Sequence, residues 1–287
     1  HAIQAQISDI VITQGAQNAL ELIVQLLVEP GDTIVVEKPT YSEALSIFHY
    51  HGAHIMEVSM KNDGMDLNEL EHVLLKHNPK LVYTMPNFQN PTGITTSQEH
   101  REKLLKICET YEVPIVEDGF VEEMKYFGKH ILPIKSMDKK GLVFYIGTFS
   151  KVLFPGIRLG WIASNTYCTQ TIAEIKKATE ISMNTITQAG LELFCKKGLY
   201  EKHLKRVHAI YKRRMNRALK VLREELRHPN IEYTKPIGGY TIWFELNKEI
   251  ISEAELLEKL ERNGVLISPG SHSFYSTGST TSFRISI

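Results

Sequence analysis

Three charged residues of this sequence could do chemistry together if the fold brings them to one place: Asp118, Lys151 and Arg158. Asp118 directly follows an apolar run, where a carboxylate is costly unless a cation meets it. Lys151 closes the segment GTFSK, in which Thr148 and Ser150 supply hydroxyl groups. A lysine near another cation in a partly dry crevice favours its neutral amine, which acts as a nucleophile and general base. Arg158 offers a guanidinium fork that fits an oxyanion such as phosphate.

A second place for an oxyanion is the segment Gly15, Ala16 and Gln17. We expect these residues to open a helix directly after a short strand, so that their backbone N–H groups can face an anion. Each feature taken alone also has a purely structural interpretation. An aspartate at a strand end often closes a turn, and an arginine often forms a surface ion pair. The functional interpretation therefore depends on the ordered set.

The periodicity of the sequence predicts the elements that position these residues. Short β-branched runs predict buried strands, and the amphipathic stretches between them predict helices. The strands are expected at 33–37, 81–85, 113–117, 142–146 and 159–163, and the helices at 16–28, 67–77 and 97–112. The last helix opens on Thr96 with Glu99 three residues on, which is the spacing of a capping box. Alternating strands and helices indicate βαβ units and a mostly parallel sheet covered on both faces.

The pattern changes near residue 200, where a long helix is expected over 199–227. After it, strands are expected at 240–246, 265–268 and 282–287, with a helix at 253–263. We therefore predict an α/β fold with two domains. A three-layer α/β/α domain with a mostly parallel sheet would span 1–200, and a smaller α+β domain would span 201–287, with the long helix as the connector.

The active crevice of an open α/β sheet lies beyond the carboxyl ends of its strands. The segments that follow the predicted strands are 38–41, 86–93, 118–120 and 147–151, and we expect them to converge. Together they hold a lysine, a carboxylate, hydrogen-bond donors and aromatic rings. Pyridoxal phosphate requires these groups for its aldehyde, its ring nitrogen, its phenolic oxygen and its ring face, together with a cradle for its phosphate.

Eight stretches of the sequence, taken in order, resemble a known family. They are TQGAQNAL at 13–20, PGDTIVVEKPTY at 30–41, PNFQNPTG at 86–93, IVEDGF at 115–120, GTFSKVLFPGIRLGW at 147–161, IGGY at 237–240, SPG at 268–270 and SFRIS at 282–286. On these motifs the chain resembles, over essentially its whole length, the class I/II aminotransferases of the fold-type-I pyridoxal-phosphate enzymes. The resemblance implies aminotransferase fold type I, pyridoxal 5'-phosphate as cofactor, and a homodimer with shared active sites.

The resemblance also implies a role for each motif residue. Lys151 would form the internal aldimine with the cofactor and shuttle a proton, and Asp118 would pair with the pyridine nitrogen. Tyr41 would stack on the ring, and Asn90 would bind the phenolic oxygen on the substrate side. Arg284 would grip the α-carboxylate of the substrate with a bidentate pair. The phosphate would be held by Gly15, Ala16, Gln17, Thr148, Ser150 and Arg158.

Two departures from the family pattern matter for function. Many relatives carry a tyrosine two residues after the aspartate, whereas this sequence has Phe120, so one donor to the phenolic oxygen is lost. The N-terminal arm and the final helix of the family have no counterpart in the 287 residues. We therefore expect the sequence to be part of a longer protein.

Two branches of the family fit, and they differ in function. PNFQNPTG resembles the free-standing aminoadipate and aromatic aminotransferases, which implies transfer of an amino group from an α-amino acid to a 2-oxo acid. The register of EDGFVEEMKY at 117–126 resembles MocR-type regulators of the GntR family, in which an aminotransferase-like domain follows a winged-helix DNA-binding domain and senses an effector with little or no turnover. We predict the transaminase and keep the regulator as the alternative. A lyase or decarboxylase on the same fold stays open.

The composition argues against several other classes of protein. Lys plus Arg and Asp plus Glu each number 33, so the formal net charge is zero, unlike the basic excess of a nucleic-acid binder. Hydrophobic residues make up 43%, enough for a packed core, and no apolar stretch is long enough to span a bilayer. The scattered cysteines Cys108, Cys168 and Cys195 predict reduced thiols in a cytoplasmic protein, with Cys108 in the core.

Two further clusters favour structural interpretations. His49, His51 and His54 have no cysteine or carboxylate at ligand spacing, so we predict no metal site. The helix predicted at 202–227 is rich in Lys and Arg, but such runs usually form a solvated face. The expected partners are therefore the amino-acid and 2-oxo-acid substrates and a second copy of the chain, with no membrane and no nucleic acid bound through this chain itself.

Overall fold

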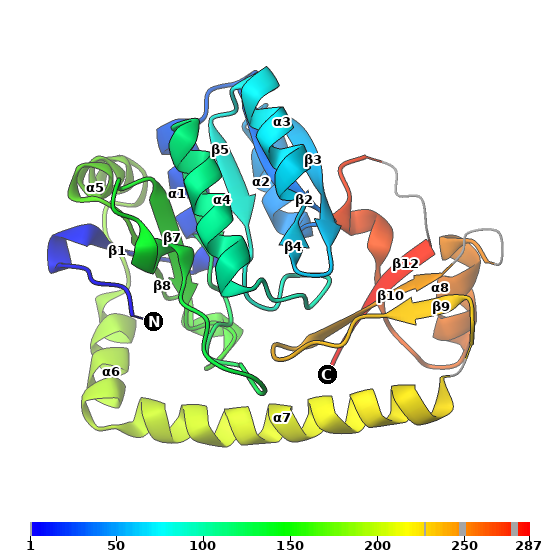
Figure 1. Cartoon of the computed structure of the whole chain (residues 1–287). Helices are drawn as coiled ribbons and strands as arrows, with labels where there is room; N and C mark the ends of the chain where they lie inside the picture. Colours follow the sequence, from blue (N-terminus) through cyan, green and yellow to red (C-terminus); the bar gives the residue numbers. More distant parts are fainter. Residues whose placement is uncertain (1, 227, 247–250, 277–280) are drawn as a thin grey trace.

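The computed structural model describes residues 2–226, 228–246, 251–276 and 281–287, which form two β-sheets and the helices around them (Figure 1). In the described residues the larger sheet has eight strands in the order β1-β8-β7-β6-β5-β2-β3-β4. These strands are β1 (Ile10–Thr13), β2 (Thr33–Lys38), β3 (His54–Lys61), β4 (Gly64–Met65), β5 (Leu81–Thr84), β6 (Ile115–Asp118), β7 (Val143–Thr148) and β8 (Gly160–Ala163).

The central strands of this sheet are parallel, as predicted. β3, β2, β5, β6 and β7 pair in parallel, whereas β4 pairs antiparallel with β3, β8 with β7, and β1 with β8. The alternation of strand and helix breaks between β7 and β8, because only the short 3-10 turn Pro155–Ile157 connects them. A parallel pair needs a longer crossover connection, so β8 returns antiparallel.

Helices cover both faces of the larger sheet and complete the predicted three layers (Figure 1). On one face lie α1 (Ala16–Leu27), α2 (Ser42–Tyr50) and α5 (Thr166–Glu180), and on the other lie α3 (Leu67–His77) and α4 (Gln98–Thr110). Strand residues alternate between the two resulting cores: Ile34 and Val36 pack with the first group, and Val35 packs with the second. This alternation follows from the two-residue period of a strand.

The smaller sheet is antiparallel and lies beyond the edge of the larger one. We call the larger sheet with the helices on its faces the larger unit, and the smaller sheet with α8 the second unit. Its strands, in the order β11-β12-β10-β9, are β9 (Ile231–Tyr233), β10 (Thr241–Leu246), β11 (Ser268–Pro269) and β12 (Thr281–Ser286), and α8 (Glu253–Arg262) accompanies them. The predicted strand at 265–268 is therefore wrong except at Ser268. A strand pair this short is set by its neighbour β12 more than by local propensity.

The long helix α7 (Leu199–Glu225) runs beneath both sheets and follows α6 (Thr185–Lys196) (Figure 1). Two of its histidines bind loops of the larger unit: Nε2 of His203 lies 2.8 Å from the carbonyl oxygen of Val152, and Nε2 of His208 lies 2.7 Å from that of Lys125. The predicted end of this helix, Arg227, lies outside the described residues. The third hydrophobic core draws residues from both sides of position 200, so the domain boundary stays a prediction.

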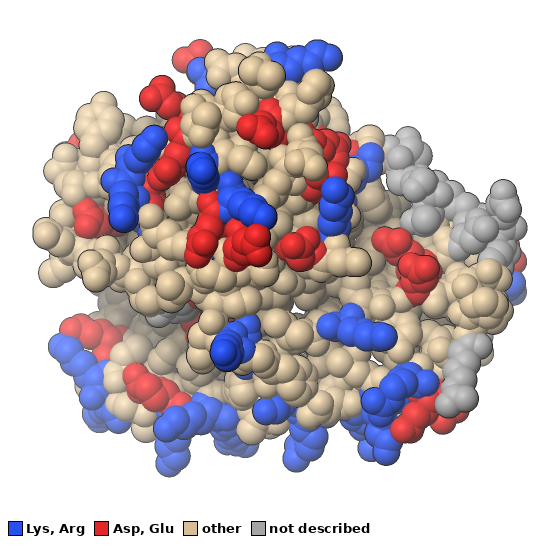
Figure 2. All heavy atoms as spheres, viewed as in Figure 1, with Lys and Arg blue, Asp and Glu red and all other residues tan. Residues whose placement is uncertain are grey.

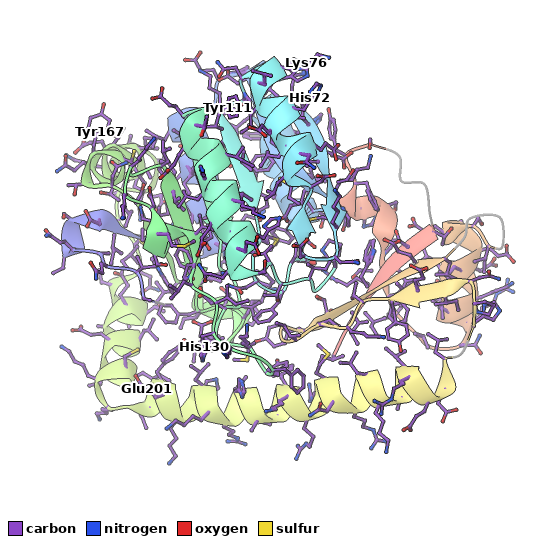
Figure 3. All side chains as sticks on the ribbon, viewed as in Figure 1. His72, Lys76, Tyr111, His130, Tyr167 and Glu201 are labelled. Atoms are coloured by element: carbon purple, nitrogen blue, oxygen red, sulfur yellow. The ribbon has the colours of Figure 1, made fainter. Side chains whose placement is uncertain are left out.

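The Lys and Arg residues of the long helix lie on an exposed face, as the sequence pattern suggested. Figure 2 shows Lys and Arg along the lower edge of the molecule, where α7 lies, and Lys202, Lys205, Arg213 and Arg217 on this helix are exposed. Figure 3 likewise shows His72 and Lys76 of α3 projecting away from the sheet, and both are exposed. Among the described residues, no helix is both long enough and apolar enough to cross a membrane.

Local details confirm some of the predictions and correct others. α4 is capped by Ser97, whose hydroxyl accepts from the amide of His100, so the capping box predicted at Thr96 is wrong by one residue. The Thr96 hydroxyl instead donates to the carbonyl of Pro86. Cys108 is fully buried in the core, as predicted. Within the described part of the chain no group of three potential ligands could hold a metal, and His51 instead pairs with Glu21 at 2.8 Å.

Candidate active site

The four segments predicted to converge lie together at the carboxyl ends of β2, β5, β6 and β7. The side chain of Gln89 donates to the carbonyl of Pro39 over 2.7 Å, which joins segment 86–93 to segment 38–41. Asp118 pairs in register with Ile146, so segment 118–120 lies beside the end of β7. The hydroxyl of Tyr240 reaches from the second unit to the carbonyl of Lys151 over 3.1 Å. The four segments therefore converge at one edge of the larger sheet, as expected.

Asp118 is a buried carboxylate with an incomplete set of partners. Its Oδ2 accepts a hydrogen bond of 2.8 Å from the hydroxyl of Tyr83. Its Oδ1 is buried and has no hydrogen-bond partner among the described residues. Burial raises the pKa of Asp118 to about 6, although Tyr83, the amide of Phe120 and the charge of Lys151 each oppose that rise. An oxygen in this state fits a ligand that donates a proton or carries positive charge.

Lys151 lies in the turn after β7 and close enough to Asp118 for its charge to act on that carboxylate. Its side chain is exposed in the described chain, which differs from the partly dry crevice that the sequence suggested. The nearby hydroxyls are ordered: Oγ1 of Thr148 lies 3.2 Å from Oγ of Ser150 and accepts from its amide.

The residues predicted to bind an oxyanion lie close together. The guanidinium of Arg158 donates to the carbonyl of Gln14 over 2.6 Å and lies directly on Gly15, where an added Cβ would come within 2.9 Å of Nη2. Gly15 has φ +93° and no side chain, so it leaves the start of α1 open. Gly160 pairs with Thr148 and approaches Gly15 so closely that a Cβ would meet its backbone at 3.0 Å. Ala16 and Gln17 follow in the first turn of α1.

Asn90 and Arg284 meet across the two units. Nη1 of Arg284 donates to Oδ1 of Asn90 over 2.6 Å, and Nη2 donates to Oγ of Ser268 over 2.8 Å. Nε of Arg284 is buried with no partner among the described residues. Tyr41 lies near both ends of the site, since the charges of Asp118 and Arg284 act on it in opposite directions, while burial raises its pKa. Asn90 and Arg284, the two residues predicted to face the substrate, are therefore in contact.

Four buried polar residues that support the site were missed by the sequence analysis: Glu37, Tyr83, Gln89 and Arg101. Arg101 is fully buried on α4 and donates to the carbonyls of Pro86 and Leu132 and to Oδ1 of Asn87. The sequence feature that could have identified such residues is a charged or polar side chain inside a run predicted to be buried, as in TIVVEK and LVYTM. Such a residue needs a partner, and the fold alone shows which one it has.

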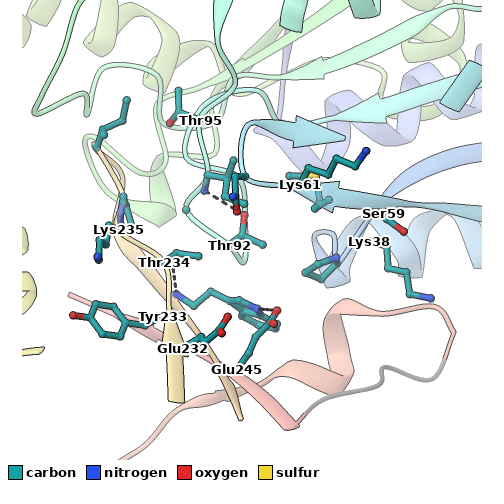
Figure 4. Close-up of a pocket in the computed structure, with 18 of the residues that line it drawn as sticks. Lys38, Ser59, Lys61, Thr92, Thr95, Glu232, Tyr233, Thr234, Lys235 and Glu245 are labelled. Carbon is teal, nitrogen blue, oxygen red and sulfur yellow. Dashed lines mark hydrogen bonds between the residues drawn. The ribbon is translucent and has the colours of Figure 1, made fainter. Parts of the chain in front are cut away.

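A cavity of about 800 Å³ opens beside the site between the two units (Figure 4). Its walls come from β2, β3, the loop around Thr92, and the strands β9 and β10. Trp243 on its wall pairs in register with Arg284, so the cavity adjoins the guanidinium site. Lys38, Lys61 and Lys235 stand at its rim together with Glu232 and Glu245, which gives a mixed charge (Figure 4).

Comparison with known proteins shows the family of this chain. The model of the family described as aminotransferase class I and II matches residues 1–287. This chain belongs to that family. Its similarity to aromatic-amino-acid aminotransferase 1 of Thermococcus litoralis is 38% identity over 91% of this chain and 64% of that protein. Among solved structures, the kynurenine aminotransferase of Pyrococcus horikoshii, crystallised with PMP, superposes with a TM-score of 0.91 and 34% identity, over 96% of this chain and 69% of the other.

The alternative branch is also found among the relatives. The transcriptional regulator YisV of Bacillus subtilis, of the helix-turn-helix type, is 31% identical over 92% of this chain and 54% of its own length. The family and the fold type predicted from the motifs are thus confirmed, and both branches are represented. The chain spans only 64% of the Thermococcus relative and about half of the regulator.

Proposed function

We propose that this family member is a pyridoxal-phosphate-dependent aminotransferase that transfers an amino group from an α-amino acid to a 2-oxo acid. The observation that carries the proposal is Asp118, a buried carboxylate whose Oδ1 has no partner among the described residues. A protonated ring nitrogen is the donor that would satisfy this oxygen and match its charge.

The opposite end of the site fits the phosphate group of that cofactor. Gly15 leaves the first turn of α1 open, and the fork of Arg158 stands beside it. Thr148 and Ser150 add hydroxyls at the end of β7. A helix N-terminus, a guanidinium and hydroxyls together are a donor set for a dianion.

Pyridoxal phosphate supplies an aldehyde that captures amino groups and a ring that takes up electrons from the Cα of the substrate. In this proposal Asp118 keeps the ring nitrogen protonated, and Tyr41 covers one face of the ring. Asn90 directs its side-chain amide to the phenolic oxygen, since its Oδ1 already accepts from Arg284. The amine of Lys151 would hold the aldehyde of the cofactor and would move the proton at Cα of the substrate.

Arg284 would bind the α-carboxylate of the substrate. Asn90 and Ser268 hold its two terminal nitrogens, and its Nε is buried and unpartnered in the described chain. A guanidinium that is already oriented loses little freedom when it binds a carboxylate, and the resulting pair fixes which Cα bond faces the cofactor.

The proposal is tested with the purified protein saturated with pyridoxal phosphate. We expect a near-visible absorbance band that survives gel filtration and that disappears in Lys151→Ala, while Lys103→Ala on the exposed face of α4 retains it. Addition of a panel of amino acids should then release 2-oxo acids. Absence of the band in the saturated wild type would contradict the proposal.

The second candidate is an effector-sensing domain of a MocR-type regulator. Its support is the 31% identity to YisV and the presence of Phe120 where many aminotransferases have a tyrosine donor. In that case amino acids should change the absorbance of the bound cofactor without releasing a 2-oxo acid. The upstream coding sequence would then encode a winged helix.

The proposal also includes the oligomeric state, the division into domains and the location of the protein. We propose a homodimer, which fits the exposed apolar residues Ile10 and Ile12 on the edge strand β1 and Ile186 on α6. We also retain the division into domains at 1–200 and 201–287 and a cytoplasmic location. Sedimentation of the purified protein tests the dimer, and limited proteolysis near residue 200 tests the division.

A further inference from the structure

A buried polar network connects the two loops that carry Tyr41 and Asn90. Glu37 near the end of β2 is fully buried. Its carboxylate accepts three hydrogen bonds: from the hydroxyl of Thr84 at 2.6 Å, from the amide of Met85 at 3.1 Å and from Nε2 of Gln89 at 3.0 Å. The network thus joins β2 to the start of the segment PNFQNPTG.

Gln89 uses its whole hydrogen-bonding capacity in this network. Its Nε2 donates both to Glu37 and to the carbonyl of Pro39, the latter over 2.7 Å. Its Oε1 accepts from the amide of Thr92 at 2.9 Å and from the hydroxyl of Thr92 at 2.6 Å. A side-chain amide has two donor hydrogens and two acceptor lone pairs, and all of them are occupied here.

The bonded atoms lie next to the residues of the proposed site. Pro39 is two residues before Tyr41, and Gln89 is the residue before Asn90. Asn90 in turn accepts the 2.6 Å hydrogen bond from Arg284 of the second unit. A displacement of Gln89 would therefore shift Asn90 relative to the loop that carries Tyr41 and relative to the guanidinium of Arg284.

Stability alone does not account for this network. Burying a carboxylate is expensive, and burial raises the pKa of Glu37 to about 7 despite its three donors. Replacing a buried polar pair by apolar residues of similar volume is often neutral or stabilising. A network that is costly and fully satisfied is better explained by the geometry that it specifies.

We propose that Glu37 and Gln89 are positioning residues that set where Asn90 and Tyr41 stand and, through Asn90, where the guanidinium of Arg284 stands. This inference rests on the proposed function, because the position of Asn90 is read through the bound cofactor. With pyridoxal phosphate bound, Asn90 would stabilise the charge of the phenolic oxygen and would so lower the pH midpoint at which the absorbance band of the cofactor shifts. A displaced Asn90 raises that pH midpoint.

The test is a swap of the two side chains. Glu37→Gln sets two amide groups face to face, and Gln89→Glu sets two carboxyl groups face to face. Glu37→Gln/Gln89→Glu restores one amide–carboxylate hydrogen bond in the reverse direction, although the bond to Pro39 is lost. We expect each single variant to weaken pyridoxal-phosphate binding about tenfold and to raise the pH midpoint of the band by about half a unit. The double variant should lie closer to the wild type than either single variant does.

Two further variants keep the test decisive. Thr92→Val removes, at nearly the same volume, a hydroxyl that donates to Gln89 and accepts from the amide of Ile94, and it should shift the midpoint in the same direction by less. Glu117→Gln is the matched control: this buried glutamate on β6 accepts from the amides of Ile134 and Lys135 and does not bond either loop. It should lower stability and leave the midpoint where it is.

The outcomes separate this inference from the function on which it rests. A wild type that binds no pyridoxal phosphate overturns the proposed function and the positioning role with it. If the wild type binds it, but the midpoint and the affinity for pyridoxal phosphate are unchanged in Glu37→Gln, Gln89→Glu and Thr92→Val, the positioning role alone is overturned. Loss of amide protection at Thr92 and Gly93 in the cofactor-free Gln89→Glu protein, measured by hydrogen exchange, supports it without any reference to activity.

Discussion

Nη1 of Arg284 lies 2.6 Å from Oδ1 of Asn90, although 194 residues separate them in the chain. The contact joins β12 of the smaller sheet to the loop after β5 of the larger one. It orients the guanidinium before any ligand is present and leaves Nε buried without a partner in the described residues. In the proposed function both sheets therefore contribute to the site for the α-carboxylate, and the geometry of that site depends on how the sheets pack against each other.

Arg284→Lys should selectively reduce the use of substrates with an α-carboxylate. A lysine at this position would keep the charge but lose the planar fork that Asn90 and Ser268 hold. We expect kcat/KM for amino acids to fall about 100-fold, with pyridoxal-phosphate binding little changed. Steady-state kinetics and a cofactor titration measure the two effects.

The control for this substitution is Arg262→Lys. Arg262 is an exposed residue of α8 that pairs with Glu258 one turn away. The same change of side chain there should leave kcat/KM within about twofold of the wild type, as expected for a surface ion pair. Equal losses in the two variants would show that Arg284 has no special part in substrate binding.

Removal of the Tyr83 hydroxyl should shift the pH dependence of cofactor binding. Tyr83 donates to Asp118 over 2.8 Å, and this hydrogen bond opposes the rise of the Asp118 pKa to about 6 that burial causes. In Tyr83→Phe that pKa rises further, so Asp118 is ionised only at higher pH. The affinity of the cofactor-free protein for pyridoxal phosphate, measured by titration from pH 5 to 8, should weaken as the pH falls. In Tyr83→Phe this weakening should begin about one pH unit higher than in the wild type.

Tyr111→Phe serves as the control for this pH experiment. The Tyr111 hydroxyl donates to Glu71 over 3.4 Å at an exposed position, where α4 ends and before β6 begins. Loss of the Tyr111 hydroxyl should leave unchanged the pH at which the affinity for pyridoxal phosphate weakens. If Tyr83→Phe also leaves this pH unchanged, Asp118 does not control cofactor binding in the way proposed.

Much of the site could be predicted from the sequence because its residues follow strands. Asp118 ends β6, and Asn90 and Lys151 lie in the segments that follow β5 and β7, and parallel strands bring such positions to one edge. Gly15 and Arg158 were predicted from their chemistry, and the structure places them in contact. The family motifs then linked Arg284 to the same site.

The parts that could not be predicted depend on tertiary partners. Glu37 and Gln89 carry no local signal of their mutual hydrogen bond, because 52 residues separate them. The return of β8 antiparallel to β7 depends on the length of a connection without a helix. β3 was missed because its sequence HIMEVSMK mixes charged and apolar residues, as suits a strand with one exposed side near the edge of the sheet.

Stability should fall as the pH rises from about 4.5 to about 7, because of the buried glutamates. Burial raises the pKa of Glu117 from 4.5 to about 7, and that of Glu37 shifts similarly. Between these values the folded protein holds protons that the unfolded chain has lost, so the stabilisation is complete below pH 4.5 and is lost as the pH passes 7. Each glutamate accounts for at most about 3 kcal/mol of this loss. Chemical denaturation of the wild type at pH 5 and pH 8 measures it.

Glu117→Gln isolates one of these contributions. The amide cannot ionise, so the free energy of unfolding of this variant should change less between pH 5 and pH 8 than that of the wild type. The free energy of unfolding of the variant should fall furthest below that of the wild type at pH 5, where Glu117 is protonated in the folded wild type. A pH dependence identical to that of the wild type would show that Glu117 does not titrate in this range.

Gly239→Ala should destabilise the joint between the two units, whereas Gly190→Ala should not. Gly239 has φ +71°, and an added Cβ would stand 2.6 Å from Cβ of Phe88 in the segment PNFQNPTG. Left-handed backbone and overpacking together should cost about 2–4 kcal/mol of unfolding free energy. Gly190 lies inside α6 with no atom within 4 Å of an added Cβ, so alanine there should stabilise by about 0.5–1 kcal/mol. Denaturant titration of both variants tests the contrast, and if Gly239→Ala is as stable as the wild type, the close approach of Phe88 to Gly239 is not a constraint on how the units pack.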